Sequence, residues 1–379
     1  MQILTIDIGT GTQDVFLFRS GLSLENGLRL VMPSPTMIVR RKIRQATEAG
    51  APLLLTGVTM GGGPSQWAVE AHRRAGLQVY ATPAAARSFN DDLDWVRRAL
   101  GVRIIGDDEA RRLTGVVRIE LGDFDYPRIV SAFESFGLAL APRAVAVAVF
   151  DHGAAPPDVS DRKFRFEYLE ARVRSGGGLT AFAHRAESIP PALTRMRAVA
   201  DSAGALDAPL VMMDTAPAAV LGASLDPRVA ARTPRLSVNV GNFHTLAMRI
   251  GAEGIEGVFE HHTGMLSRTK LDDFLERFAA GRLTNEEVFA DQGHGALTLT
   301  TDALDLASGP YGVAVTGPRR ELMFGSRLRP YFAVPAGDMM SAGCFGLLLA
   351  TAELVPETAD AVHAAVSGDR LSAAPWDVD

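Results

Sequence analysis

The feature that most constrains the fold is a short pattern that occurs twice: an apolar strand, a bend that contains glycine, and a second strand. The first copy is residues 7–14 (DIGTGTQD), which lies between two apolar, β-forming segments. The second copy is residues 239–246 (NVGNFHTL), in the other half of the chain. Each copy predicts a β-hairpin whose glycines let the backbone turn tightly and approach a ligand closely. The repetition indicates a duplicated lobe.

Length and the order of the predicted elements favour two α/β units. A chain of 379 residues is too long for one compact core. Strand-like and helix-like segments alternate in both halves, as in sheets with parallel parts covered by helices. We expect residues 1–150 and 151–337 to form the two lobes, with a helix in residues 338–354 returning to the first. The stretch 154–175, rich in proline and charge, is expected to be a surface excursion.

Composition excludes several classes of protein. The net charge of −6 argues against a nucleic-acid partner, because neutralising phosphates requires a basic face. The single cysteine, Cys344, excludes an internal disulfide framework and a cysteine-ligated iron–sulfur cluster. The chain begins with a strand-like segment, and its most apolar stretch is too short to span a membrane. We therefore expect a cytoplasmic protein without a membrane partner, and both a homodimer and a protein partner stay open.

The first bend has the chemistry of a phosphate site. Amides and hydroxyls of the residues between its strands can surround phosphate oxygens, and these residues are Thr10, Gly11, Thr12 and Gln13. Asp7 ends the first strand and is well placed to hold Mg²⁺ through water. The alternative is an ordinary hairpin with a polar turn.

Three further segments are informative because of their order along the chain. Residues 214–222 (DTAPAAVLG) and 338–346 (DMMSAGCFG) predict helices of small residues that can pack closely on another helix. Residues 313–320 (VAVTGPRR) predict an apolar strand that ends in a turn with two arginines. Taken singly, each of these segments could be ordinary core.

In sequence order, the five segments resemble the signature of the sugar kinase/Hsp70/actin superfamily: phosphate-1, first connecting helix, phosphate-2, adenosine loop and second connecting helix. The resemblance implies an α/β fold of two ribonuclease-H-like lobes that face a central cleft, with ATP and Mg²⁺ as cofactors. It implies nucleotide contacts from Thr10, Gly11, Thr12, Gln13, Asp214, Gly241, Asn242, Gly317 and Arg319. The chain departs from the pattern at Asn239, where the superfamily has aspartate. An amide cannot act as a carboxylate base, so water activation is not expected there.

Four other segments resemble a microbial family often labelled pyruvate formate-lyase activating enzyme. They are residues 57–64 (GVTMGGGP), 91–94 (DDLD), 151–153 (DHG) and 260–263 (EHHT).

The substrate side of the site is expected near these segments. The glycines Gly61, Gly62 and Gly63 lead into a predicted helix, and such entry loops can bind anions. Asp151 ends a buried strand, where α/β proteins tend to place chemistry, and could accept a proton from a substrate hydroxyl. The alternative for Asp151 is a capping role at a turn.

Histidines form a second candidate group. His152, His261 and His294 are expected to contact the substrate. Together with Asp151 they could instead hold a second metal ion, since imidazole and carboxylate suit zinc, iron or manganese. Adjacent residues on a strand point to opposite faces, so at most one of His261 and His262 should face a shared site.

The leading hypothesis is an ATP/Mg-dependent phosphotransferase, kinase-like, that acts on a small-molecule acceptor, with Asp7 and Asp151 as catalytic residues. A second hypothesis is a nucleotide-driven ATPase switch that activates a metalloenzyme. A third is a metal-dependent hydrolase or carbamoyl-type transferase that uses the histidines.

Overall fold

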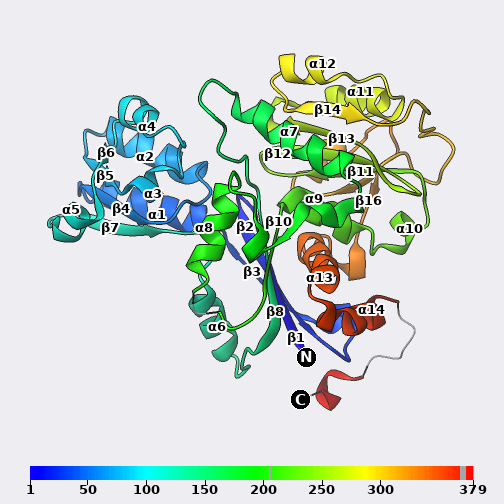
Figure 1. Cartoon of the computed structure of the whole chain (residues 1–379), viewed down its shortest axis with the longest axis horizontal. Coiled ribbons are helices and arrows are strands. Elements are labelled where there is room, and N and C mark those ends of the chain that lie inside the picture. The colour runs from blue at the N-terminus through cyan, green and yellow to red at the C-terminus, as the bar shows by residue number, and fades with distance from the viewer. Residues whose placement is uncertain (205, 368–372, 379) are drawn as a thin grey trace.

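The structure is a computed structural model of the 379-residue chain, and it describes residues 1–204, 206–367 and 373–378. These residues form two six-stranded sheets and one four-stranded sheet. In Figure 1 the four-stranded sheet lies on the left, the first six-stranded sheet in the lower centre and the second at the upper right.

The first six-stranded sheet begins with an antiparallel meander and continues with parallel strands. Its order is β3-β2-β1-β8-β10-β9, in which β8 is parallel to β1 and β10 is parallel to β8. The apolar run AVAVAV that follows Arg143 in β8 suits a strand that is buried on both faces. The strands are β1 (Gln2–Ile8), β2 (Thr12–Arg19), β3 (Leu28–Pro33), β8 (Pro142–Val149), β9 (Ala183–Arg185) and β10 (Leu210–Met213).

The second six-stranded sheet repeats this plan. Its order is β14-β13-β12-β11-β15-β16, with an antiparallel meander of β11, β12 and β13 and with β15 and β16 parallel to β11. The strands are β11 (Arg235–Val240), β12 (His244–Gly251), β13 (Gly254–His262), β14 (Gly295–Thr298), β15 (Ala314–Thr316) and β16 (Tyr331–Phe332). A meander of three strands followed by two parallel strands is the ribonuclease-H-like order, so its duplication confirms the predicted fold class.

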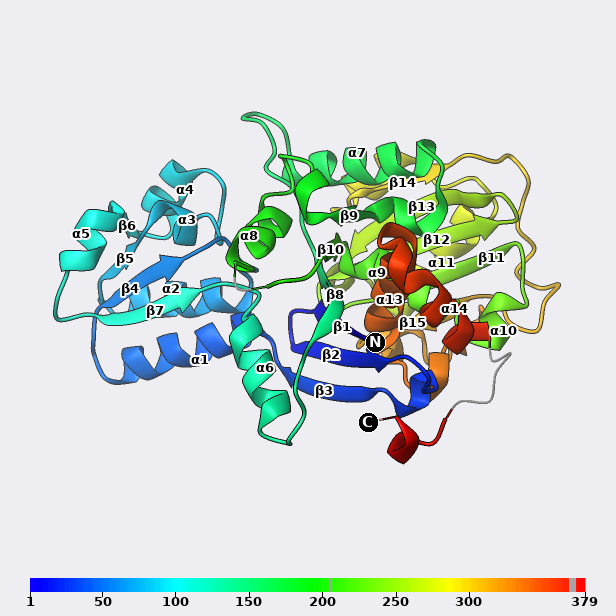
Figure 2. The same cartoon turned by 60° about the horizontal axis from the view of Figure 1, so that its bottom comes forward.

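The four-stranded sheet is an insertion between β3 and β8. It is wholly parallel, in the order β6-β5-β4-β7, and has a hydrophobic core of its own. Figure 2 shows it with its helices at one end of the molecule. Its strands are β4 (Leu53–Gly57), β5 (Val79–Ala81), β6 (Arg103–Ile104) and β7 (Val117–Leu121). Its helices are α1 (Pro35–Glu48), α2 (Pro64–Arg74), α3 (Pro83–Ala86), α4 (Leu93–Ala99) and α5 (Asp107–Arg112).

Two expectations differ from this arrangement. We placed a lobe boundary near residue 150, yet β9 and β10 follow that residue and complete the first sheet. The stretch 154–175 was expected to be a surface excursion, but most of it is helix α7 (Asp161–Arg174). The hydrophobic periodicity of this helix is hard to recognise in the sequence, because a charged residue, Arg165, occupies one of its fully buried positions.

The remaining helices pack around the two larger sheets. They are α6 (Tyr126–Glu134), α8 (Thr194–Ser202), α9 (Thr215–Ala223), α10 (Pro227–Ala230), α11 (Arg268–Ala279), α12 (Asn285–Ala290), α13 (Ala342–Leu354) and α14 (Ala359–Ser367). Over the part of the chain that the structure describes, none of the helices combines the length and the apolar character needed to cross a bilayer.

Helices α9 and α13 cross at backbone contact, as their small residues predicted. A Cβ atom on Gly222 of α9 would lie 1.7 Å from the carbonyl oxygen of Ala342. A Cβ atom on Gly346 of α13 would lie 1.9 Å from the carbonyl oxygen of Ala218. Both neighbours are backbone atoms, so only glycine permits this approach.

We expect Gly222→Ala to lower the free energy of unfolding by about 1–3 kcal/mol or more, because the added methyl group forces two buried helices apart. Gly264→Ala is the matched control, since a Cβ atom there meets nothing within 4 Å. Denaturant unfolding of both variants measures the effect. Equal stability of the two variants would contradict the required contact.

Candidate active site

The two glycine bends open onto one cavity of about 500 Å³. Thr12 of the first bend and Gly241 of the second both line it. A Cβ atom on Gly11 would lie 3.3 Å from Nδ2 of Asn242, so the bends also touch each other. Two hairpins from two different sheets therefore face the same cavity.

Two carboxylates lie side by side on the first hairpin. Asp7 of β1 and Asp14 of β2 are register partners, and both line the cavity. The Asp7 carboxylate accepts a hydrogen bond from Thr215 Oγ1 at 2.6 Å. Asp14 Oδ2 accepts one from Thr12 Oγ1 at 3.1 Å, while Oδ1 of Asp14 is buried without a hydrogen-bond partner in the described chain.

Burial is the main cause of the raised pKa values of both carboxyl groups. The pKa of Asp7 is raised to about 7: burial raises it most, the hydrogen bond from Thr215 lowers it, and the charges of Asp14 and Asp214 raise it. Burial also raises the pKa of Asp14 to about 6. Two carboxylates on paired residues with raised pKa values are poorly satisfied by this chain alone, and a cation bound to them would stabilise their charged forms.

The second hairpin supplies the opposite wall. Asn239, Gly241, Asn242 and Gly317 all line the cavity. Gly317 has a φ of +104°, and a Cβ atom on it would lie 2.4 Å from the carbonyl oxygen of Val240. The turn after β15 therefore requires glycine and keeps the backbone open toward the ligand space.

The inserted sheet contributes a third wall through the loop Gly61, Gly62 and Gly63, which lines the cavity. A Cβ atom on Gly63 would lie 2.8 Å from the Phe243 ring, which sits beside the second bend. Phe243 also packs edge-on against Trp67 of α2, with ring centroids 5.7 Å apart. The insertion thus contacts the second hairpin directly.

Asp151 also lines the cavity, but both of its carboxylate oxygens accept hydrogen bonds from the backbone. Oδ1 accepts a hydrogen bond from Gly153 N at 2.8 Å, and Oδ2 accepts one from Met196 N at 2.9 Å. Burial raises its pKa, and the two backbone N–H groups lower it. This geometry holds the loop after β8 against the start of α8.

Asp91 lines the same cavity, and it is exposed to solvent whereas Asp151 is buried. Partial burial, together with the charges of Asp151 and Asp161, raises its pKa to about 6. A carboxylate with a pKa close to neutrality is suited to accept a proton in this wall of the cavity.

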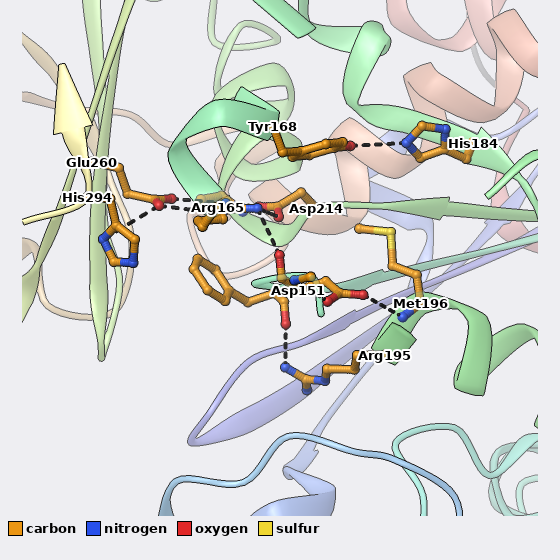
Figure 3. A network of polar contacts seen from close by, with 12 residues as sticks. Asp151, Arg165, Tyr168, His184, Arg195, Met196, Asp214, Glu260 and His294 are labelled. Atoms are coloured by element: carbon orange, nitrogen blue, oxygen red, sulfur yellow. Dashed lines mark hydrogen bonds and ion pairs between the residues drawn. The ribbon is translucent and has the colours of Figure 1, made fainter. Parts of the chain in front are cut away.

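Behind the cavity, Arg165 joins the two six-stranded sheets (Figure 3). Its guanidinium pairs with Asp214, at the start of α9, and donates to Glu260 of β13 at 2.9 Å and 3.2 Å. All three side chains are fully buried. Arg165 Nη1 also donates to the carbonyl oxygen of Asp151 at 3.1 Å. The network ties the wall that carries Asp151 to both sheets.

Four histidine rings gather beside this network. The centroid of His244 lies 5.3 Å from that of His152, 5.0 Å from that of His262 and 5.0 Å from that of His294. The ring of Phe150 stacks on His244 at 4.0 Å. His152 and His244 line the cavity. The rings of His152 and His244 therefore form part of the cavity wall near Asp151, and those of His262 and His294 pack against His244 outside the lining.

Several predicted contact residues lie in the cavity lining, and others do not. Those that line it are Asp7, Thr10, Thr12, Gly61, Gly62, Gly63, Asp151, His152, Gly241, Asn242 and Gly317. Gln13 is not among the described lining residues, and its side chain donates to the carbonyl oxygen of Pro33. The lining also does not include Gly11, His294 or Arg319, and Arg319 pairs with Glu321 at the surface. Alternation along β2 turns the side chain of Gln13 to the face opposite that of Asp14, which explains its position outside the lining.

Two other expectations need correction. Asp214 does not face the cavity, because its carboxylate is taken up by Arg165. His261 does not join the other rings, because its Nε2 lies 3.0 Å from a carboxylate oxygen of Asp291. Its neighbour His262 points to the opposite face of β13 and joins the cluster instead.

Sequence reasoning missed His244 and Thr215. His244 opens β12 within the second bend, and it is the cross-strand partner of His262. Directly paired residues share a face of the sheet, so the hairpin register was the signal for this pair. Nothing local in the sequence indicates that Thr215 bonds to Asp7, which is 208 positions away.

The strand order and the cavity between the hairpins define the class of protein: a two-lobed fold of the sugar kinase/Hsp70/actin superfamily, enlarged by one insertion. Within that class, the chain belongs to the family described as "Putative pyruvate format-lyase activating enzyme (DUF1786)", whose model matches residues 60–322. No curated protein matches the chain.

Two solved structures are similar at a low level. An exopolyphosphatase-like protein aligns with 10% identity and a TM-score of 0.22, over 83% of this chain and 65% of its own. The PPX-GPPA enzyme of Aquifex aeolicus aligns with 10% identity and a TM-score of 0.22, over 94% of this chain and 93% of its own. The chain thus spans somewhat less than two thirds of the first of them.

The stability of the protein should depend on the charge of Asp7. Its folded-state pKa, about 7, lies above the ordinary value of 3.8, so the stability that it contributes at low pH is lost as the pH rises toward and through 7. In chelator, the melting temperature of the wild type should therefore fall relative to that of Asp7→Asn between pH 5 and pH 8, by several degrees. Asp201→Asn, on the exposed side of α8, should follow the wild type. A difference between Asp7→Asn and the wild type that stays constant with pH would contradict the shift.

Proposed function

We propose that the chain binds a nucleoside triphosphate with Mg²⁺ between its two glycine bends and transfers a phosphoryl group to a small acceptor. The observation that carries this proposal is that Thr12 and Gly241, from duplicated hairpins of two sheets, line one cavity. Phosphoryl transfer asks a protein mainly for positioning and neutralisation of charge. Paired hairpins that face one cavity supply the positioning.

The residues at the base of the first hairpin fit a magnesium site. Asp7, which is half-buried, and Asp14, which is buried, are register partners, and Oδ1 of Asp14 has no hydrogen-bond partner within the described residues. Mg²⁺ prefers such carboxylate oxygens together with water and phosphate, and when bound it would neutralise charge on the phosphate oxygens. The backbone amides around Thr10 and Gly11 would orient the phosphate tail, and Gly241 and Asn242 would close the other side.

The acceptor would lie between the inserted sheet and the end of β8. Gly61, Gly62 and Gly63 line the cavity in the loop before α2, and His152 lines it after the end of β8. We assign proton acceptance to Asp91 rather than to Asp151, because both Asp151 oxygens already accept backbone hydrogen bonds. Burial lowers the pKa of His152 to about 3, so its ring is a weak base at neutral pH.

Transfer to an acceptor is favoured over hydrolysis by Asn239. This amide lines the cavity on the second hairpin, where the related superfamily pattern has a carboxylate that can orient water. The switch hypothesis would be preferred if ATP turned over without any acceptor and a partner protein stimulated the reaction.

Removing the Thr10 hydroxyl should weaken nucleotide binding. Thr10→Val keeps the branched shape but loses a hydrogen bond to a charged group, worth about 1.5–3 kcal/mol, so the dissociation constant for Mg·ATP should rise about tenfold or more. Thermal shift with and without Mg²⁺ measures it, since a ligand of the native state raises the melting temperature. Thr301→Val, at an exposed position, is the control. Wild-type protein that binds no nucleotide would overturn the proposal.

The proton-accepting residue can be identified by comparing two substitutions. Asp91→Asn should lower the rate of phosphoryl transfer about 10²–10⁴-fold with little change in nucleotide affinity, which is the usual contribution of a general base. Asp151→Asn should mainly lower the melting temperature, since the amide cannot accept both backbone hydrogen bonds. The reverse result, with transfer lost only in a stably folded Asp151→Asn, would assign the role to Asp151.

A further inference from the structure

A set of ring nitrogens at the cavity wall converges on one point. His152 follows β8, His244 opens β12 and His294 precedes β14, so three separate elements supply them. One ligand atom from each lies within 4.8 Å of the others. Three imidazole nitrogens bound to one ion at about 2.0–2.1 Å would be roughly 3.3 Å apart, which modest side-chain rotations would achieve.

Two of these three rings, His244 and His294, carry buried nitrogens without hydrogen-bond partners in the described part of the chain. Within the described chain, Nε2 of His244 and both ring nitrogens of His294 are buried without any hydrogen bond. A buried polar atom without a partner is unfavourable, and its presence in a folded protein calls for an explanation. Burial, first of all, lowers the pKa of His294 to about 2 and that of His244 well below its ordinary value. Neutral imidazole is the form that binds metal ions.

Packing alone does not explain the arrangement. The stack of Phe150 on His244, at 4.0 Å, uses ring faces, and further aromatic rings would provide such contacts without buried nitrogens. The convergence of nitrogen atoms needs a separate reason. A positive ion with coordination sites for imidazole supplies one.

The surroundings of His294 resemble those of a metal ligand. Oε2 of Glu260 lies 3.7 Å from Nδ1 of His294, and Arg165 holds that carboxylate in place (Figure 3). Metal-binding histidines commonly direct their second ring nitrogen to a carboxylate, which fixes the ring and the tautomer. This leaves Nε2 of His294 for the ion.

We propose that His152, His244 and His294 form a binding site for a divalent first-row transition metal, with zinc as the best fit. Three neutral imidazoles suit zinc, and a site with three protein ligands keeps a fourth position for water or substrate. His152 and His244 line the cavity, so that position faces the proposed acceptor space. The site is distinct from the Asp7 and Asp14 pair, which offers oxygen ligands only. It extends beyond the proposed function and does not depend on it.

The test measures metal content without nucleotide. Protein purified without a histidine tag is stripped with chelator, incubated with Zn²⁺, freed of excess ion and analysed for metal by mass spectrometry. We expect about one equivalent per wild-type chain, with most of it lost in His244→Phe and in His294→Phe, which keep a ring at each position. His261→Phe is the matched control, because His261 is a buried neighbour that faces Asp291 instead. It should keep the wild-type content.

Two further readouts keep the result interpretable if a variant folds poorly. Zn²⁺ should raise the melting temperature of the wild type and of His261→Phe by several degrees, but not that of His294→Phe. Wild-type protein loaded with Co²⁺ should show the intense visible absorption of a four-coordinate ion. The proposal is overturned if the wild type retains no stoichiometric metal, or if His261→Phe loses metal to the same extent as His294→Phe. Because nucleotide is absent throughout, failure here would leave the proposed phosphoryl transfer untouched.

Discussion

The backbone contact between α9 and α13 is the constraint on which the rest of the structure depends. Gly222 and Gly346 permit it, and a side chain at either position would meet backbone atoms of the other helix. The same helix α13 brings Gly343 against Asp7, where a Cβ atom would lie 1.9 Å from Oδ2. The crossing therefore sets how far apart the two hairpins lie and how much room the Asp7 carboxylate has. Larger residues here would separate the bends that line the cavity.

Buried charge forms the second level of organisation. Arg165 compensates Asp214 and Glu260 in a region from which water is excluded. Such ion pairs contribute little net stability once desolvation is counted, but removing one partner leaves an uncompensated charge. Their effect here is geometric: one guanidinium fixes the end of β8, the start of α9 and the middle of β13 relative to one another. The proposed active-site wall and the histidine cluster are both built on these elements.

Much of the fold could be predicted from local patterns, whereas sheet membership could not. The two hairpins around residues 7–14 and 239–246 and the two small-residue helices follow from periodicity and glycine placement. The sequence patterns of the strands between residues 53 and 121 do not tell whether these strands extend the first sheet or form a separate one. Sheet membership depends on hydrogen bonds between segments that are distant in the sequence. The helical pattern of α7 was missed for a related reason. Arg165 occupies a fully buried position, where a hydrophobicity pattern leads one to expect an apolar residue.

The sequence by itself determined the chemistry of the bends, the need for glycine in them and the rule that His261 and His262 face opposite ways, since all of these depend on residue type and on a local repeat. The tertiary structure decided which of these two histidines joins the ring cluster and that His244 and His294 meet in it. It also decided that the Asp151 carboxylate accepts hydrogen bonds from backbone amides, while the Asp91 side chain lines the cavity and is exposed. The reason is physical: a local period fixes the face on which a side chain lies. Only the packing of sheets and loops far apart in the chain fixes what that face meets.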